Sequence, residues 1–273
     1  MYFIGTAGFS YRDWEDVFYP KGYDKFSYYS MIFNFLELNS TFYSPFEKRF
    51  FDNFAKRLKP DFKLVIKAHQ NFTHRKDFSE AELKDFLFNI SGLKPYLLCI
   101  LFQFPYSFHF STENIERIEK IRQLGCDYNI SIEVRHQSFL QDKFFEFCKK
   151  NNIIFVNIDQ PQISYNIPLL STVTNQNLTY FRFHGRRADN WFNENIEPYQ
   201  RYDYLYSEDE LKNLAEIIKN GDCENIIISF NNHYRAKAVI NALQLKNLLG
   251  EKPIISVDQI IRNFENSNEN SLF

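Results

Sequence analysis

The chain has 273 residues, of which 44% are hydrophobic and 24% are charged, and its formal net charge is -2 at pH 7. These values are ordinary for a globular protein with a large apolar core. A charge so close to zero excludes a strongly basic chain that binds nucleic acid non-specifically, although a local basic site remains open. No apolar run reaches the length of a membrane span and no leader-like segment opens the sequence, so we expect no membrane partner.

The four cysteines are scattered along the chain and form no C-x-x-C pair. Three of them lie in apolar or helical segments, which favours reduced thiols over disulfides or a zinc site. We therefore expect a cytoplasmic protein. The high aromatic content, 31 Phe and 17 Tyr, is explained more simply by codon usage in an AT-rich genome than by an aromatic ligand surface.

Eight short apolar segments along the chain have the length and composition of β-strands. They cover residues 2–5, 35–39, 63–69, 97–104, 129–135, 153–159, 179–185 and 225–231. Helical periodicity or capping motifs predict helices at 24–33, 45–58, 113–124, 141–151, 234–249 and 255–263, and after the capping boxes at 79–82 and 207–210. Segment 160–177 shows little periodicity, so we expect an irregular crossover there.

The strands share a change of polarity toward their carboxyl ends. In segment 35–39, Leu36 and Leu38 lie on one face, while the other face changes from Phe35 to Glu37 and Asn39. A strand with one solvated face would carry polar residues along its whole length. The pattern therefore predicts strands packed on both faces, whose carboxyl ends open onto a site.

Eight such strands alternating with helices predict a parallel α/β fold. A single (β/α)8 TIM-type barrel accounts for both the alternation and the polar carboxyl ends, where such barrels place their active sites. An open doubly wound sheet is the alternative, but the sequence has no glycine-rich phosphate loop. We expect one domain over residues 1–262, followed by a polar, frayed tail at 263–273.

The last inward-facing positions of the predicted strands define the candidate site. They are Glu37, Asn39, Lys67, His69, Gln103, Glu133, Arg135, Asn157, Asp159, Arg182, His184 and Asn231. A charge-balanced network that merely closes the barrel is one interpretation. A functional site is favoured, because burying so many charges for stability alone is inefficient and barrel mouths usually carry function.

Three roles are predicted within this set. Lys67, Arg135 and Arg182 would hold a phosphate or carboxylate, with Asn39, Tyr43, Gln103 and Asn231 as further substrate-binding residues. Glu37, Glu133 or Asp159 would act as general acid or base, and His69 and His184 would transfer protons. A Schiff base on Lys67 is a further possibility that we keep open.

A divalent metal bound by His69, Glu133, Asp159 and His184 is the alternative use of the same residues. Three interleaved cations and the absence of an H-x-H or H-E-x-x-H spacing weigh against it. His74, His136 and His233 fall in loops or on the opposite face and are expected at the surface or in supporting positions. Trp14 and Trp191 could line a lid, but packing over the barrel ends is as good an expectation.

Seven motifs in the same order along nearly the whole chain resemble the YecE-like family, also called domain of unknown function 72. They are Ile4-Gly5-Thr6-Ala7-Gly8-Phe9-Ser10-Tyr11, Glu37-Leu38-Asn39-Ser40-Thr41-Phe42-Tyr43, Lys67-Ala68-His69 with Thr73-His74, Leu101-Phe102-Gln103-Phe104-Pro105, Glu133-Val134-Arg135-His136-Gln137-Ser138-Phe139, Arg182-Phe183-His184-Gly185, and Phe230-Asn231-Asn232 with Asn241-Ala242. The chain departs from the family pattern at Ala7 and Phe9, at Tyr106 and at Phe139. The resemblance implies a TIM-barrel fold and supplies no substrate.

Three functional hypotheses follow. The first is an enzyme that binds a small anionic molecule, phosphorylated or nucleotide-like, at the barrel mouth and uses carboxylates for acid–base chemistry. The second is a metal-dependent phosphoesterase or nuclease-like hydrolase, by analogy with other barrels. The third is a non-catalytic ligand-binding barrel. No cofactor is required by the sequence, a hydrolase is slightly favoured among reaction classes, and the oligomeric state is left open.

Overall fold

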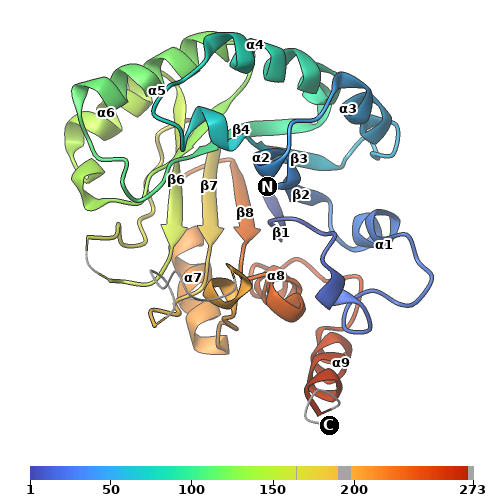
Figure 1. The fold of residues 1–273 in the computed structure, drawn as a ribbon. Helices are drawn as coiled ribbons and strands as arrows, with labels where there is room; N and C mark the ends of the chain where they lie inside the picture. Colours follow the sequence, from blue (N-terminus) through green and yellow to red (C-terminus); the bar gives the residue numbers. More distant parts are fainter. Residues whose placement is uncertain (164, 190–197, 270–273) are drawn as a thin grey trace.

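A parallel sheet of eight strands forms the centre of the molecule in the computed structural model, which describes residues 1–163, 165–189 and 198–269 (Figure 1). The strands are β1 (Tyr2–Thr6), β2 (Phe35–Leu38), β3 (Lys63–Lys67), β4 (Leu97–Gln103), β5 (Ile130–Glu133), β6 (Ile153–Asp159), β7 (Leu178–Phe183) and β8 (Asn225–Phe230). Their order in the sheet is β1-β8-β7-β6-β5-β4-β3-β2, with every pairing parallel. This confirms the predicted (β/α)8 barrel.

The ring of strands closes between β1 and β2 through few backbone contacts. Ala7, just after β1, forms an isolated parallel bridge with Glu37 of β2. Next to this junction, toward the amino ends of the two strands, the Tyr29 hydroxyl accepts a hydrogen bond from the Thr6 amide and donates one to the Phe35 carbonyl, each at 3.0 Å. A buried side chain therefore bridges the two strands where the ladder does not. The barrel is therefore nearly closed, and the junction of β1 and β2 is the one place among the described strands where the hydrogen-bonded ladder is incomplete.

The helices follow the strands and surround them. They are α1 (Lys25–Ile32), α2 (Ser40–Tyr43), α3 (Lys48–Ala55), α4 (Glu80–Asn89), α5 (Thr112–Leu124), α6 (Asp142–Lys150), α7 (Glu208–Lys219), α8 (Lys237–Leu248) and α9 (Val257–Glu269), with 3-10 turns at Arg12–Trp14, Gln70–Phe72, Ile90–Tyr96, Gln137–Phe139, Pro198–Tyr202 and Tyr234–Ala236. In Figure 1, α3 to α6 arch over one side of the strands, and α7 and α8 cover another. Ser79 caps α4, and Ser207 and Glu210 form the full capping box of α7.

Three predicted helices have clearly different bounds from those expected. The helix predicted at 234–249 begins at Lys237, after a 3-10 turn in which Arg235 and Ala236 adopt left-handed backbone angles. The helix predicted at 45–58 covers only Lys48–Ala55, because Glu47 is still extended, and the one-turn helix α2 precedes it. The helix predicted at 255–263 begins at Val257 and continues to Glu269. Residues 270–273 lie outside the described part. Segment 160–177 has no helix or strand among its described residues, as expected.

Two apolar layers are separated by the strands. An inner cluster fills the barrel with side chains such as Phe35, Val65, Leu101 and Ile227. A larger outer cluster packs the opposite strand faces, such as that of Leu36, against the helices. Both faces of the strands are therefore buried, which is why their sequences are so apolar. No helix in the described residues has the length and hydropathy needed to cross a membrane.

Candidate functional site

A buried ion-pair cluster lies inside the barrel toward the carboxyl ends of its strands. Arg182 of β7 holds both oxygens of Glu37 of β2: Nε donates to Oε2 at 2.8 Å and Nη2 donates to Oε1 at 2.6 Å. Its remaining nitrogen, Nη1, donates to Glu133 of β5, and the Tyr180 hydroxyl donates to Glu37. Arg182 is only 1% exposed, and both glutamates are fully buried. One arginine therefore joins opposite walls of the barrel.

The cluster continues toward the opening through the second glutamate. Arg135, two residues beyond β5, donates from Nε and Nη2 to Glu133 Oε1 at 3.1 and 2.9 Å. His184 Nε2 lies 3.4 Å from the same oxygen, while its Nδ1 lies 3.0 Å from the Asn231 side-chain nitrogen. Because the Asn231 nitrogen is a donor, Nδ1 accepts and Nε2 carries the proton that faces Glu133.

The two glutamates are ionised at neutral pH. Burial is the largest single influence and raises the pKa of each carboxyl, but the charge and hydrogen bonds of Arg182, together with Tyr180 and Ser229, hold the pKa of Glu37 below its ordinary value. The pKa of Glu133 lies well below its ordinary value for the same reason, with His184 and Arg135 adding to the effect of Arg182. Burial lowers the pKa of His184 to about 4, so that its imidazole is neutral.

These protonation states do not suit the acid–base roles predicted for Glu37, Glu133 and His184. A carboxylate whose oxygens are held by guanidinium groups is a weak base, and a histidine with so low a pKa is a poor proton carrier near pH 7. The geometry instead makes Glu37 and Glu133 the groups that fix Arg182 and Arg135 in place. Glu37, Glu133, Arg182 and Arg135 therefore form a charge-balanced network, which was one of the two interpretations of these residues offered by the sequence.

Lys67, at the end of β3, has different surroundings. It is 8% exposed, and its Nζ lies 3.7 Å from the centre of the Phe42 ring. Among the described residues its amine takes part in no ion pair or hydrogen bond. Burial, together with the positive charge of Arg182, lowers the pKa of Lys67 to about 7, although Glu133 and Glu37 act in the opposite direction. The neutral amine is therefore well populated near pH 7, in contrast to an ordinary lysine.

Two adjoining cavities open above Lys67, and both are lined by Tyr43, Lys67, Arg135 and Tyr202. The first has a volume of about 340 Å³, and its other lining residues are Tyr11, Asn39, Arg182, Asn231 and His233. The second has a volume of about 270 Å³, and its other lining residues are Phe42, His74, Gln103, Pro105, Tyr106 and Arg201. Within the described part of the chain, neither lining contains a carboxylate.

All seven predicted substrate-binding residues line these cavities: Asn39, Tyr43, Lys67, Gln103, Arg135, Arg182 and Asn231. Tyr43 is 69% exposed and stands at the opening. Gln103 donates its amide to the Phe104 carbonyl at 2.7 Å, so it is anchored to its own strand. The side-chain oxygen of Asn39 is buried and has no hydrogen-bond partner among the described residues.

Several lining residues come from loops and were not predicted. Tyr11 stacks on His233 with ring centres 4.3 Å apart, and burial lowers the pKa of His233 to about 4. His74 packs edge-on against Phe42 and has its pKa lowered to about 4, first by burial and then by Lys67. Strand periodicity contains no information on such residues. Tyr11 and His74 do fall in the family-like motifs, which was the available signal.

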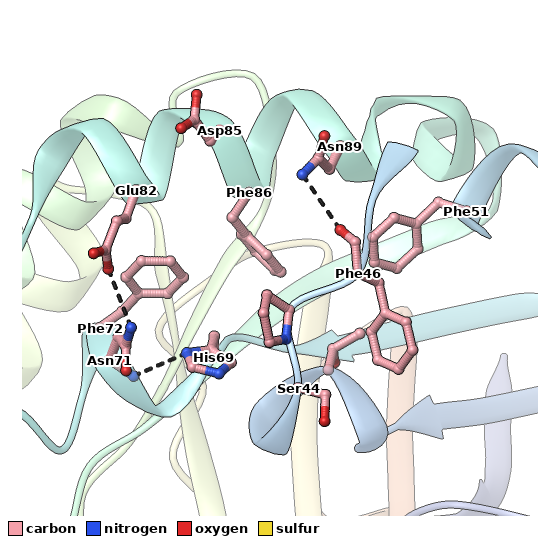
Figure 2. Close-up of a pocket in the computed structure, with 12 residues that line it drawn as sticks. Ser44, Phe46, Phe51, His69, Asn71, Phe72, Glu82, Asp85, Phe86 and Asn89 are labelled. Carbon is pink, nitrogen blue, oxygen red and sulfur yellow. Dashed lines mark hydrogen bonds between the residues drawn. The ribbon is translucent and has the colours of Figure 1, made fainter. Parts of the chain in front are cut away.

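His69 does not belong to this site, contrary to prediction. It lines a separate cavity of about 290 Å³ outside the barrel, beneath α4 (Figure 2). There its Nδ1 accepts a hydrogen bond from the Asn71 amide at 3.3 Å, and Asn71 in turn bonds Glu82 of α4. Strand β3 ends at Lys67 and a 3-10 turn follows at Gln70–Phe72, so the inward alternation does not reach His69.

Asp159 was also misplaced, because the facing of β6 is the reverse of that predicted. Ile154, Val156 and Ile158 face the barrel interior. Asp159 faces outward, where it accepts two hydrogen bonds from Arg186 and one from the Tyr206 hydroxyl at 2.6 Å.

Asn157 faces outward with Asp159. It binds the backbone of Thr172 in the irregular crossover, as donor at 3.0 Å and as acceptor at 2.8 Å. The polar end of this strand therefore has local structural partners and contributes nothing to the mouth.

The four residues of the metal alternative are consequently not assembled. Glu133 and His184 are neighbours, but His69 and Asp159 lie on other sides of the strands. In the described ranges, no three His, Cys, Asp or Glu side chains lie together as a metal site would need. Trp14 is buried, and its indole donates to the His233 carbonyl, so it packs beneath the mouth rather than forming a lid. Trp191 lies outside the described residues.

Comparison with known proteins assigns the chain to a family and agrees with the barrel fold described above. A family model described as "Protein of unknown function DUF72" matches residues 3–261. The chain belongs to the DUF72 family. A UPF0759 protein, YunF, of Bacillus subtilis (strain 168) is 29% identical over 271 residues, which cover 91% of this chain and 95% of that protein.

Solved structures of DUF72 proteins share the fold. One from Thermotoga maritima MSB8 is 35% identical, with a TM-score of 0.83 over 92% of this chain and 100% of that chain. One from Enterococcus faecalis V583 is 28% identical, with a TM-score of 0.83 over 92% of this chain and 96% of that chain. The resemblance to the YecE-like family is thereby confirmed. These relatives are named by family alone.

Proposed function

We propose that this DUF72 protein is an enzyme that binds a small anionic substrate at the carboxyl-end mouth of its barrel. The observation that carries the proposal is the composition of the two cavities above Lys67. Their described lining contains Lys67, Arg135, Arg182 and Arg201 but no carboxylate. Such a lining attracts anions and rejects cations, and arginine is suited to phosphate and carboxylate groups.

The two buried glutamates, Glu37 and Glu133, also support this proposal, because they hold the arginines of the site in place. Glu37 and Glu133 hold Arg182 and Arg135 by several hydrogen bonds each, which fixes the guanidinium groups before any ligand arrives. Preorganised charges lose little conformational freedom on binding. The carboxylates line neither cavity, and their charge is offset by the ion pairs with Arg182 and Arg135.

The shape of the site suits a small molecule with a partly apolar or aromatic body. Cavities of about 340 and 270 Å³ share four lining residues, and the first alone reaches the usual range of about 300–1,000 Å³ for small-molecule sites. Tyr43, Tyr202 and Tyr106 provide flat walls for it. The buried amide oxygen of Asn39 offers a partner to a ligand hydroxyl or amino group.

Proton transfer in this enzyme is assigned to Lys67. Its pKa of about 7 allows Lys67 both to accept and to donate a proton near neutral pH. The pKa values of Glu133 and His184 are too low for either group to do so. Arg182 and Arg135 would hold the anionic group, while Lys67 would act on the neighbouring atom.

Binding of inorganic phosphate, followed by thermal unfolding and calorimetry, tests the anion site. Phosphate at 100 times its Kd should stabilise the protein by about 2.7 kcal/mol. Arg135→Gln should lose this effect, whereas Arg57→Gln should keep it, because Arg57 pairs with Asp24 at the surface and lines neither cavity. Equal phosphate binding by Arg135→Gln would contradict the proposed site.

Catalysis needs its own test. Native mass spectrometry of the purified protein should identify a retained anionic metabolite, which is then incubated with enzyme and with Lys67→Met. The proposal predicts conversion by the wild-type protein and none by the variant. A ligand that is bound through Arg135 but never converted would instead support the non-catalytic binder.

A further inference from the structure

We infer that Lys67 is a nucleophile that forms an imine with a substrate carbonyl, and that the substrate is therefore an anionic carbonyl compound such as a 2-oxo acid or a phosphorylated aldehyde. This inference rests on the proposed function, because it names the chemical class that the same mouth would take. It assigns to Lys67 a covalent step in addition to proton transfer.

The position of the amine favours this role. Lys67 Nζ lies against the Phe42 ring at 3.7 Å, on the floor shared by both cavities. Its side chain is 8% exposed, so the amine is reached through the cavities rather than from open solvent. The Phe42 ring face attracts an ammonium group, but burial and the nearby cations Arg182 and Arg135 outweigh this attraction and favour the neutral amine. Burial and neighbouring cations are the conditions that activate imine-forming lysines.

Lys246 provides a direct comparison within the same chain. It is also 8% exposed, but its Nζ lies 3.2 Å from the Glu251 carboxylate. That partner stabilises the ammonium form, which has no lone pair for attack. No carboxylate contacts the Lys67 amine within the described chain. The two lysines are equally buried, so burial does not distinguish them. The difference is the partner, and it points to reactivity at Lys67.

The surrounding cations select the second feature of the substrate. Arg135 lines both cavities together with Lys67, and Arg182 lines one of them. A carboxylate or phosphate held by these groups would place an attached carbonyl carbon near the amine. Tyr43 also lines both cavities, and its phenol hydroxyl, which is protonated at neutral pH, can donate to the carbonyl oxygen.

The covalent step balances without any further reactant. The lone pair of the neutral amine forms a C–N bond to the carbonyl carbon, and the C=O π bond breaks toward oxygen to give a carbinolamine. Loss of water then forms the C=N bond, and both protons of the original amine leave with the carbonyl oxygen. The imine draws electrons from the adjacent carbon, so a bond to that carbon is the one that subsequent chemistry would break.

Reductive trapping tests the inference directly. The full-length protein is incubated at pH 7 with glyoxylate and sodium cyanoborohydride, and peptide mass spectrometry measures carboxymethylation of each lysine. Lys67 should be modified at least on the order of 10-fold faster than Lys246 or the exposed Lys21, because a lowered pKa leaves far more neutral amine. Lys246→Met should retain the modification, and Lys67→Met should lose it.

Selectivity for an anion is tested in parallel with glycolaldehyde, an uncharged aldehyde of the same carbon number. Glyoxylate should trap Lys67 faster than glycolaldehyde does, and inorganic phosphate should protect against glyoxylate. Trapping of Lys67 at the rate of Lys21, or equal rates for the two aldehydes, would overturn the inference. Failure of trapping in a protein whose phosphate binding depends on Arg135 would refute the imine alone, whereas failure of both would refute the proposed function as well.

Discussion

Replacing Lys67 by methionine should make the protein more stable, and by an amount that depends on pH. Burial lowers the pKa of Lys67 from 10.5 to about 7 in the folded protein. Between these two values the unfolded chain binds more protons than the folded chain, so stability rises with pH through this window. Below pH 7 both states are protonated, and folding must bury the full charge.

The magnitude follows from the two pKa values. A difference of about 3.5 units corresponds to about 5 kcal/mol of destabilisation at low pH, and about 3 kcal/mol of that is relieved between pH 6 and pH 9. Methionine has a similar length and no charge, so it removes the whole effect. The Lys67→Met variant should therefore exceed the wild type in stability by about 3 kcal/mol more at pH 6 than at pH 9.

Urea unfolding at both pH values measures this difference. Lys246→Met is the matched control, since it removes an equally buried lysine that has an ion-pair partner in Glu251. Subtracting the wild type at each pH cancels the titration of the groups that do not interact with Lys67; His74, which does, titrates below this window in the folded protein. A stability difference between Lys67→Met and wild type that is the same at pH 6 and pH 9 would refute the assigned amine.

Three further changes test the rest of the account. Arg182→Met should destabilise the protein by about 3–5 kcal/mol in urea unfolding, because it leaves Glu37 and Glu133 buried without their shared partner; a loss below about 1 kcal/mol would contradict the cluster. His69→Ala should leave phosphate affinity unchanged by calorimetry, since His69 lines the outer cavity of Figure 2, and a loss of affinity would return it to the site. Ser207→Ala should lower stability by about 1 kcal/mol through loss of the α7 capping box, and an unchanged urea midpoint would speak against that cap.

The sequence predicted the barrel and most of its mouth because strand alternation is a strong physical constraint. Where a strand is followed directly by the cavity, as at Glu37, Lys67, Glu133 and Arg182, the predicted face is the observed one. A one-residue error in facing would place a charge in the apolar outer layer, which is energetically unfavourable. These residues could therefore be assigned from their spacing alone.

Strand alternation predicts the inward face only where the two faces differ in polarity and the backbone is extended. It failed where one of these conditions was not met. In β6 both faces carry large apolar residues, and the polar end is accounted for by Asp159 binding Arg186 and Tyr206 outside the barrel. Beyond β3 the backbone leaves the extended conformation, so His69 turns away. Neither the partners of Asp159 nor the end of a strand is encoded in local periodicity.

Residues from loops could not be placed by any strand rule. Tyr11, His74 and Tyr202 reach the mouth because the loops above the barrel fold over it. The roles of the correctly placed residues were also beyond the sequence, because protonation depends on distances. Glu37 and Lys67 are both buried ionisable groups on neighbouring strands, yet one has an arginine beside it and the other an aromatic ring.

The protonation state of the Lys67 amine can be observed directly by NMR. In protein carrying lysine labelled with ¹³C and ¹⁵N, the Lys67 side-chain resonances are assigned by their absence in Lys67→Arg and followed from pH 5 to pH 11. We predict a midpoint near 7, which moves to higher pH when phosphate binds, because an anion stabilises the ammonium form. A midpoint near 10.5 that does not respond to phosphate would contradict both the reactive amine and the anion site above it.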